Sequence, residues 1–178
     1  GLWATDTAGH DAGPSLTSAF PAGRDTVFLY VATTGSNNGT EGDRADPWDS
    51  IQHAINAIPG DLIRLETHYV VEVLDSGRYE EEVTLNRTAD ESYSVTVRAA
   101  IGQNPTIVGP NNRDAVLIKT DYAVLTGFRI EADQKVGVIV SSADGVTLAD
   151  IIIDGNGNTA GIHLVEAART SIHDVRIN

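Results

Sequence analysis

Apolar and polar residues alternate in short segments over the last third of this chain, and the alternating segments recur at a nearly constant spacing. Three series of apolar positions share the repeat, each advancing by 22 to 24 residues: Leu125, Leu148 and Ile172; Ile130, Ile153 and Ile177; Ile118, Val140 and Leu164. Alternation of this kind is typical of strands with one buried face. The shared period predicts three short strands in every repeat.

Such a repeat predicts an all-β, right-handed parallel β-helix with about five three-sided coils. No single coil buries its inward face alone, whereas stacked coils form one continuous core. A leucine-rich repeat has a similar length, but its Leu/Asn consensus is absent from this sequence. A β-sandwich needs hairpin turns and would leave the common register of the three series unexplained.

The residues before the repeats predict an entry strand and one short helix. Residues 26–31 read TVFLYV, a β-branched and aromatic run, and a polar loop with several glycines follows. Asp49 or Ser50 is suited to cap a helix, and isoleucines recur on one face at 51, 55 and 58. Pro59-Gly60 ends the helix, which we expect to cap the first coil.

We therefore divide the chain into three parts. Residues 1–25 are rich in small and polar residues and form an extended arm or linker. Residues 26–60 hold the entry strand, the Gly-rich loop and the capping helix. Residues 61–178 form the coils, and the segment 66–76 is long enough to predict an extra strand or loop that projects there.

Several motifs in residues 27–178 resemble a known family. They are Tyr30-Val31, the run GSNNGT from Gly35, Asp46-Pro47-Trp48, Ser50-Ile51-Gln52, Ala54-Ile55 and Pro59-Gly60-Asp61, followed by GRYEEEVTLN and SVTVRAAIGQNPTIVGP. Together they resemble the pectate-lyase-like superfamily of right-handed parallel β-helix proteins, with an N-terminal region of the DUF1565 type. The resemblance implies a strand, a Gly-rich loop and a helix covering the first coil. It implies little about activity, because this fold carries many functions.

The chain ends at Val175-Arg176-Ile177-Asn178, inside the repeat pattern. An uncovered last coil exposes backbone groups and apolar side chains, which native proteins rarely tolerate. Either the chain is part of a longer parent solenoid, or a copy of itself covers the end and gives head-to-tail stacking. A cap formed by residues 1–25 is a third alternative.

Some apolar residues are predicted to face outward and form contacts with a partner or with a covering segment of this chain. Leu117 and Ile139 stand between buried pairs on neighbouring coils, and Ile152 does so on another face. Arg129 and Arg176 occupy positions equivalent to Ile152 in the coils before and after it. The full predicted interface comprises Leu117, Ile139, Ile152, Val175, Ile177 and two arm residues, Trp3 and Phe20.

Composition and charge narrow the classes of partner. Twelve Lys and Arg against 25 Asp and Glu give a net charge of −13, which disfavours nucleic acid and anionic membranes. It also disfavours a polyanionic glycan without a bridging cation. Cysteine is absent, so disulfides and thiolate metal sites are excluded. No run of eighteen apolar residues predicts membrane insertion.

The residues suggest little catalytic chemistry. Polysaccharide lyases of this fold use a Lys or Arg base with carboxylates that hold calcium. The chain has only Lys119 and Lys135, and neither stands beside an acidic cluster. Asp150 and Asp174 occupy one turn position, 24 residues apart, where a calcium ion is an alternative to two solvated carboxylates. No motif predicts another cofactor.

These observations predict an extracellular or cell-surface β-helix module that is non-catalytic and has a structural or self-assembly role. Asn38 and Asn86 begin N-glycosylation sequons, which fits that location. The alternatives are a polysaccharide-processing module, acting as a lyase, epimerase or hydrolase, and a carbohydrate-binding module. In both, a polysaccharide is the partner.

Overall fold

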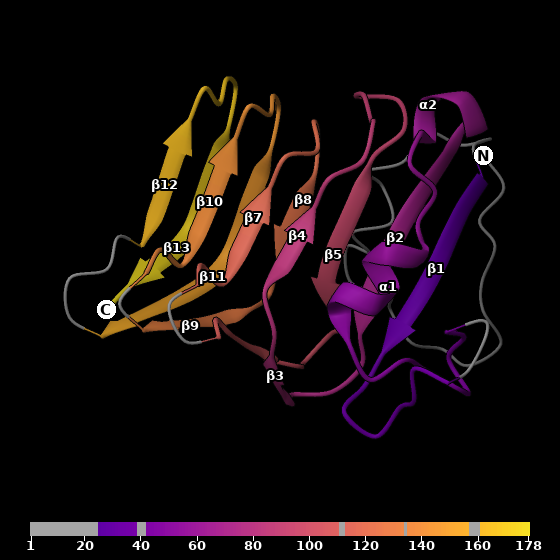
Figure 1. The fold of residues 1–178 in the computed structure, drawn as a ribbon, viewed down its shortest axis with the longest axis horizontal. Helices are drawn as coiled ribbons and strands as arrows, with labels where there is room; N and C mark the ends of the chain where they lie inside the picture. The colour runs from indigo at the N-terminus through magenta and orange to yellow at the C-terminus, as the bar shows by residue number, and fades with distance from the viewer. Residues whose placement is uncertain (1–24, 39–41, 111–112, 134, 157–160) are drawn as a thin grey trace, which may run out of the picture.

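A computed structural model describes residues 25–38, 42–110, 113–133, 135–156 and 161–178. The chain winds into a parallel β-helix with three sides, each a stack of strands in parallel register (Figure 1). The predicted all-β, three-sided parallel β-helix with a capping helix is confirmed.

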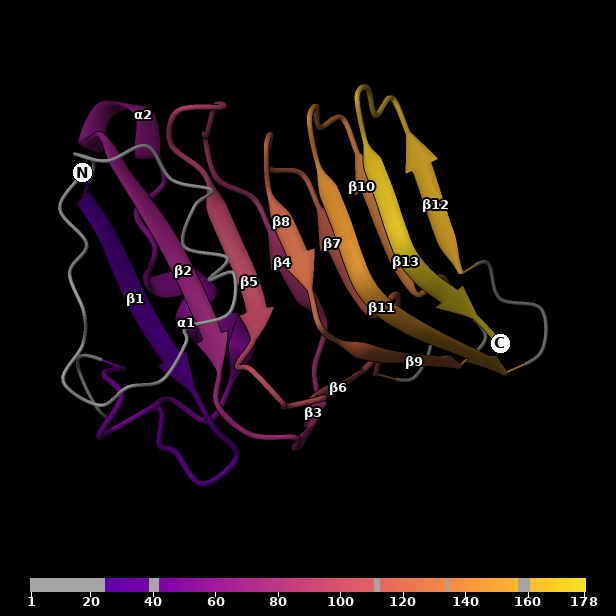
Figure 2. The same cartoon turned by 180° about the vertical axis from the view of Figure 1, so that it is seen from behind.

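The first side is the longest stack. It contains, in order, β1 (Asp25–Val31), β2 (Thr67–Val73), β5 (Val95–Ala99), β8 (Val124–Thr126) and the first parts of β11 (Thr147–Asn156) and β13 (Ser171–Ile177). Figure 2 shows these strands side by side from behind. The segment predicted to project at 66–76 is β2, which lies inside this side between β1 and β5.

The second and third sides complete each coil. The second side stacks β3 (Arg78–Glu80), β6 (Thr106–Val108), β9 (Arg129–Asp133) and the later parts of β11 and β13. The third side stacks β4 (Val83–Leu85), β7 (Val116–Ile118), β10 (Val138–Ser141) and β12 (Ile162–Val165). The four strands of the third side complete four turns of the β-helix, and β13 forms two sides of a partial fifth turn. The sequence predicted about five coils.

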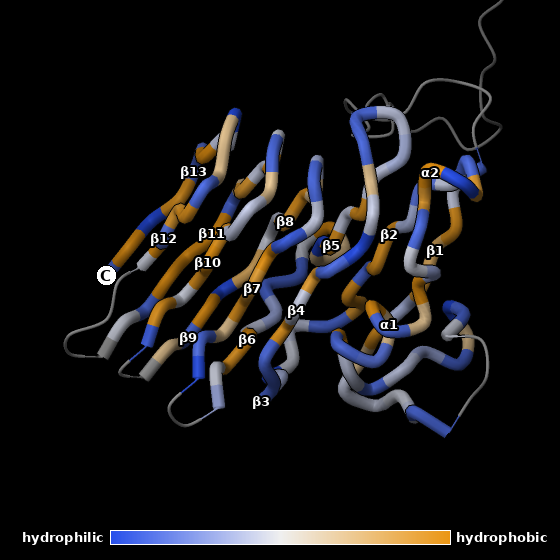
Figure 3. The backbone as a smooth tube through the Cα atoms, turned by 45° about the horizontal axis from the view of Figure 1, so that its top comes forward, coloured by the Kyte–Doolittle hydropathy of each residue, from blue (hydrophilic) through white to orange (hydrophobic). Residues whose placement is uncertain are grey.

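The core consists of columns of apolar side chains running along the helix axis. The residues of the first column are in register across six strands and comprise Leu29, Val71, Val97, Leu125, Leu148 and Ile172. Its four middle members are fully buried. All three predicted series are confirmed as columns, because Ile130 pairs with Ile153 and Val140 pairs with both Ile118 and Leu164. Figure 3 shows hydrophobic residues along the strands and hydrophilic residues in many connecting turns.

The capping helix forms where the sequence predicts it. α1 spans Ile51–Ala57, and the Ser50 side chain accepts a hydrogen bond from the His53 backbone at 3.0 Å. Ile51, Ala54 and Ile55 are fully buried against the first coil. One further helical turn, α2 (Leu62–Leu65), is capped by Asp61 and lies before β2. The sequence did not predict α2, because a single turn is too short to show helical periodicity.

Polar contacts fasten α1 to the first coil at both ends. Glu81 accepts hydrogen bonds from the Ser50 hydroxyl and from the backbone of Ile51 and Gln52, at 2.6, 2.8 and 3.0 Å. Arg87 donates to the carbonyls of Ile55 and Ile58 at 2.7 and 2.9 Å. A carboxylate at the first turn and a guanidinium at the last complement the helix dipole.

The side chain of Gln52 also pairs with the edge of the first coil. Its amide accepts a hydrogen bond from the Thr84 backbone and donates one to the Thr84 carbonyl. The amide thus takes the place of a further strand beside β4. This contact closes part of the edge that a parallel sheet would otherwise leave open.

Candidate functional site

The outward face of the second side carries a row of polar side chains that runs along the described coils. Strand alternation places residues 78 and 80, 129 and 131, and 152 and 154 on this face in matching register. We call the connected set Arg78, Arg129, Glu131, Asp154 and Asn178 the ionic row.

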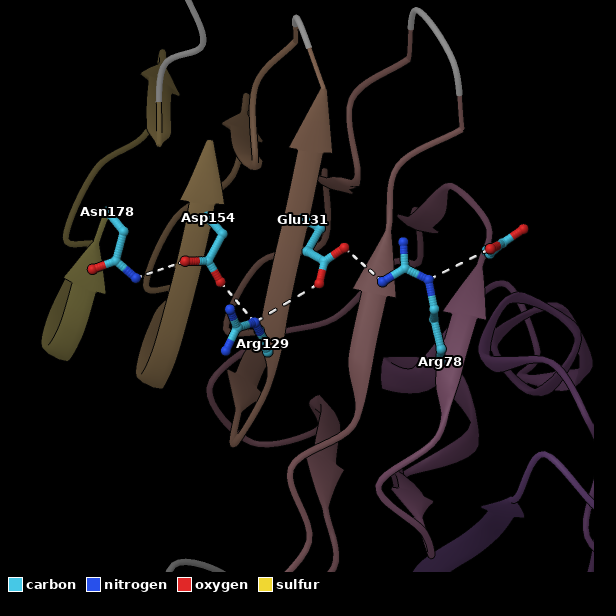
Figure 4. Close-up of polar contacts among 6 residues, drawn as sticks. Arg78, Arg129, Glu131, Asp154 and Asn178 are labelled. Atoms are coloured by element: carbon cyan, nitrogen blue, oxygen red, sulfur yellow. Dashed lines mark hydrogen bonds and ion pairs between the residues drawn. The ribbon is translucent and has the colours of Figure 1, made fainter. Parts of the chain in front are cut away.

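The ionic row is linked by short contacts along the helix axis (Figure 4). A nitrogen of Arg78 lies 2.6 Å from a carboxylate oxygen of Glu131. The Nε atom of Arg129 lies 3.8 Å from Glu131 and 2.7 Å from Asp154. The Asn178 side chain donates a hydrogen bond to Asp154 at 2.6 Å. Guanidinium, carboxylate and amide groups therefore follow one another across the coils.

The contact between Arg78 and Glu131 passes over one whole coil. β6 lies between β3 and β9 and presents only Thr106 and Val108 at these two positions. The guanidinium therefore reaches across short side chains to its partner. The hydrogen bond to Glu131 raises the pKa of Arg78 above its ordinary value.

The ionic row stays accessible to solvent. About half of each guanidinium side chain is exposed, with 51% for Arg78 and 49% for Arg129, and Asp154 keeps 24%. Neighbouring coils are about 4.8 Å apart, and the planar groups of the row lie on the coils of β3, β9, β11 and β13, with the coil of β6 between the first two. Groups placed along the axis in this way suit the hydroxyl groups of a chain molecule that lies along it. A ligand would reach these groups only by replacing part of the contacts within the row.

Part of this site follows from the sequence. The predicted series Arg129, Ile152 and Arg176 is confirmed, because Ile152 pairs with both arginines in register. Sequence reasoning missed the carboxylates Glu131 and Asp154. The sequence nevertheless contained the information needed to find them. Glu131 follows Arg129 by two residues and Asp154 follows Ile152 by two, and residues two apart on a strand share a face.

The predicted calcium residues occupy one turn of consecutive coils. Asp150 and Asp174 interrupt the pairing of β11 with β13 at the corner between the first and second sides, and both are exposed. Their φ angles are 50° and 54°, and Gly127 stands at the same corner with a φ of 84°. Asp tolerates this left-handed region better than most residues, which explains its presence without a metal. Calcium binding here stays a prediction, and in the described ranges no three His, Asp or Glu residues gather to hold a metal ion.

The predicted outward apolar residues lie as expected from strand alternation. Leu117 and Ile139 are paired on the third side and are half-buried, whereas Ile152 is 37% exposed in the second side. In the last strand, Val175 packs partly against the core and Ile177 is 56% exposed. Trp3 and Phe20 lie outside the described residues. A partner at these positions stays a prediction.

The two sequon asparagines are exposed. Asn38 lies in the loop after β1, and Asn86 follows β4. Both positions are accessible to a modifying enzyme, and glycosylation stays a prediction. Among the described residues no helix is long and apolar enough to cross a membrane.

Comparison with known proteins identifies the fold. No family model matches the chain, and no curated protein matches it. A search of solved structures matches a GH136 lacto-N-biosidase from Eubacterium ramulus, with a TM-score of 0.69 and 14% sequence identity. The match covers 84% of this chain and 34% of that chain, so the residues described here span about a third of the matched protein.

The match supports a β-helix fold and leaves the finer resemblance untested. Membership of the pectate-lyase-like superfamily and of the DUF1565 type stays a prediction from the quoted motifs. At 14% identity the likeness concerns the path of the chain and not its chemistry.

Proposed function

We propose that this chain is an extracellular β-helix module that binds a glycan along the ionic row. The observation that carries the proposal is the connected series of accessible guanidinium, carboxylate and amide groups on one flat side of the coils. Each of these groups can hydrogen-bond sugar hydroxyls, and the row extends along the helix axis over several coils, as an extended oligosaccharide would. The fold shared with a lacto-N-biosidase supports a carbohydrate as the ligand.

The capped N-terminal end favours this function over filament formation by coil stacking. A head-to-tail filament requires both ends of the β-helix to accept a further coil. At the N-terminal end, α1 covers the first coil and Gln52 occupies part of the β4 edge. An incoming coil would have to displace α1 together with its contacts to Glu81 and Arg87.

Binding, rather than cleavage, is the role that the ionic row supports. Hydrolysis of a glycosidic bond uses two carboxyl groups that flank the bond with different roles. In this row Glu131 and Asp154 both face Arg129, which lies between them. Such an arrangement holds the two carboxylates in place and leaves no evident division into acid and base.

A glycan array followed by titration of the strongest ligand tests the proposal. Arg129→Ala and Glu131→Gln should each weaken binding by about tenfold, which corresponds to roughly 1.4 kcal/mol. The matched control is Arg113→Ala, which removes an exposed ion pair with Glu82 (2.9 Å) near the third side.

Wild-type affinity in the control, together with weakened binding in both row variants, supports the proposal. It is overturned if no glycan binds or if the control loses as much affinity as the row variants. Release of new reducing ends from a bound oligosaccharide would show cleavage and would overturn the assignment to binding alone.

A further inference from the structure

A second group of side chains lies on the first side, near its N-terminal end. Phe28 and Tyr30 point outward from β1, and register pairs Tyr30 with Glu72 of β2 and Glu72 with Arg98 of β5. Arg44 joins them from the loop after β1. We call Phe28, Tyr30, Arg44, Glu72 and Arg98 the aromatic cluster.

The two rings lie almost parallel on the surface. Their centroids are 6.2 Å apart and their planes differ by 14°. The Arg98 guanidinium lies 5.7 Å from the Phe28 centroid, and that of Arg44 lies 5.6 Å from the Tyr30 centroid. Phe28 nevertheless remains 41% exposed, which leaves ring surface open to a ligand.

A buried carboxylate holds the cluster in position. Glu72 is 8% exposed, and one of its oxygens accepts two hydrogen bonds from Arg98, at 3.0 and 2.8 Å. Its other oxygen lies 3.4 Å from Arg44. A carboxylate removed from water requires such partners. The arrangement therefore keeps both guanidiniums at the rings before any ligand arrives.

Exposed ring surface beside fixed donors is suited to one class of ligand. The face of a pyranose ring presents C–H groups with partial positive charge, which pack on the negative face of an aromatic ring. Its hydroxyl groups accept hydrogen bonds from a guanidinium. The Arg44 side chain is 68% exposed, and a guanidinium has further donors besides the nitrogen that contacts Glu72.

The charge of the chain favours a neutral sugar over an acidic one. The net charge of −13 repels an anionic chain molecule at a distance. Within the cluster, Glu72 already balances part of the charge of the two arginines. We propose that the aromatic cluster is a separate subsite for a neutral pyranose unit, with Phe28 as the stacking platform and Arg44 as the hydrogen-bond donor.

This inference rests on the proposed glycan function but uses a different side of the β-helix. Titration of neutral oligosaccharides from the array, monitored by calorimetry, tests both sites in parallel. Phe28→Ala and Arg44→Ala should each lower the affinity by about fivefold to tenfold. The matched control is Ile101→Ala, which removes a fully exposed apolar side chain at the corner after β5.

Salt separates a neutral ligand from a charged one. Affinity for a neutral sugar should stay within about twofold between roughly 0.05 and 0.5 M NaCl, because no charge on the ligand is screened. A steep loss with salt, or binding of acidic oligosaccharides alone, overturns the assignment.

The variants keep the two proposals distinguishable. Weakened binding in Arg129→Ala with wild-type affinity in Phe28→Ala and Arg44→Ala overturns the subsite and leaves the ionic row standing. The reverse pattern supports the subsite and overturns the row. If no oligosaccharide binds to the wild-type chain, both proposals fail.

Discussion

The repeating coils and the capped N-terminal end are held together by different kinds of contact. In the coils, one apolar column after another repeats the same packing, as from Val97 through Leu125 to Leu148. At the capped end, contacts occur once each: Glu81 and Arg87 bind the two ends of α1, and Gln52 binds the edge of β4. The repeated packing of the apolar columns stabilises the coils, whereas the contacts of Glu81, Arg87 and Gln52 occur only where the first coil begins.

This difference has an energetic basis. Burial of an apolar side chain contributes about 1.5–3 kcal/mol and requires no particular partner. A hydrogen bond contributes less on balance, but leaving a buried donor without its acceptor costs about 1–3 kcal/mol. Variants in the two regions should therefore differ in magnitude, and the following predictions test that order.

The largest effect is expected in the middle of the first column. Leu125 is fully buried between Val97 and Leu148. Leu125→Ala removes buried methyl groups and leaves a cavity, and should lower the free energy of unfolding by about 2–5 kcal/mol. Urea denaturation monitored by circular dichroism measures the change.

The control for this variant is Ile101→Ala, since Ile101 is fully exposed and should change stability by less than about 0.5 kcal/mol. Equal stabilities of the two variants would contradict the column as the main source of stability.

A smaller effect is expected at the helix cap. Glu81 accepts three hydrogen bonds from the start of α1, so Glu81→Ala should cost about 1–3 kcal/mol. Its neighbour Glu80 offers a matched control, because its side chain is 74% exposed and lies 3.5 Å from Arg78, a contact at the surface that contributes little. Hydrogen exchange at the α1 amides should rise in Glu81→Ala alone. A loss shared by Glu80→Ala would show that any carboxylate in this turn acts equally.

The smallest effect is expected to depend on pH and concerns Asp75, which binds the loop after β1 to the first coil. Partial burial alone would raise the pKa of Asp75, but hydrogen bonds from Thr33, Tyr79 and Gly77 outweigh it and lower the pKa. A lowered pKa contributes stability above the unfolded value of about 3.9. That contribution is lost as the pH falls through the folded value.

Asp75→Asn should therefore reduce the melting temperature at neutral pH and flatten its decline below about pH 4. Thermal unfolding at a series of pH values measures both changes. Asp150→Asn, at an exposed turn that tolerates Asn equally well, serves as the control. If the melting temperature of Asp75→Asn declines below about pH 4 as steeply as that of the wild type, the role assigned to these hydrogen bonds is contradicted.

Elements with a strong local pattern were predictable from the sequence. The apolar columns follow from alternation with a period near 23, and α1 follows from a capping Ser50 with isoleucines on one face. The segment 66–76 was harder to interpret. Its length suggested an extra strand or loop that projects, but register with β1 and β5 makes residues 67–73 an ordinary strand of the first side.

The partners of charged residues were predictable only in part. Arg129 and Arg176 occupy the same position of the repeat as Ile152, so their alignment along the axis could be predicted from the sequence. The contact of Arg78 with Glu131 could not be predicted, because it joins residues 53 apart across a whole coil. Likewise, no local pattern connects Glu81 with Ser50, although this pair fastens the cap.

The sequence by itself determined the repeat, the inward columns and the position of the capping helix, because burial of apolar groups follows a period that can be read locally. Only the tertiary structure decided which charges meet, where the aromatic cluster assembles and how the first coil is closed. Polar contacts are directional and short, so they depend on the register between coils joined by turns of unequal length.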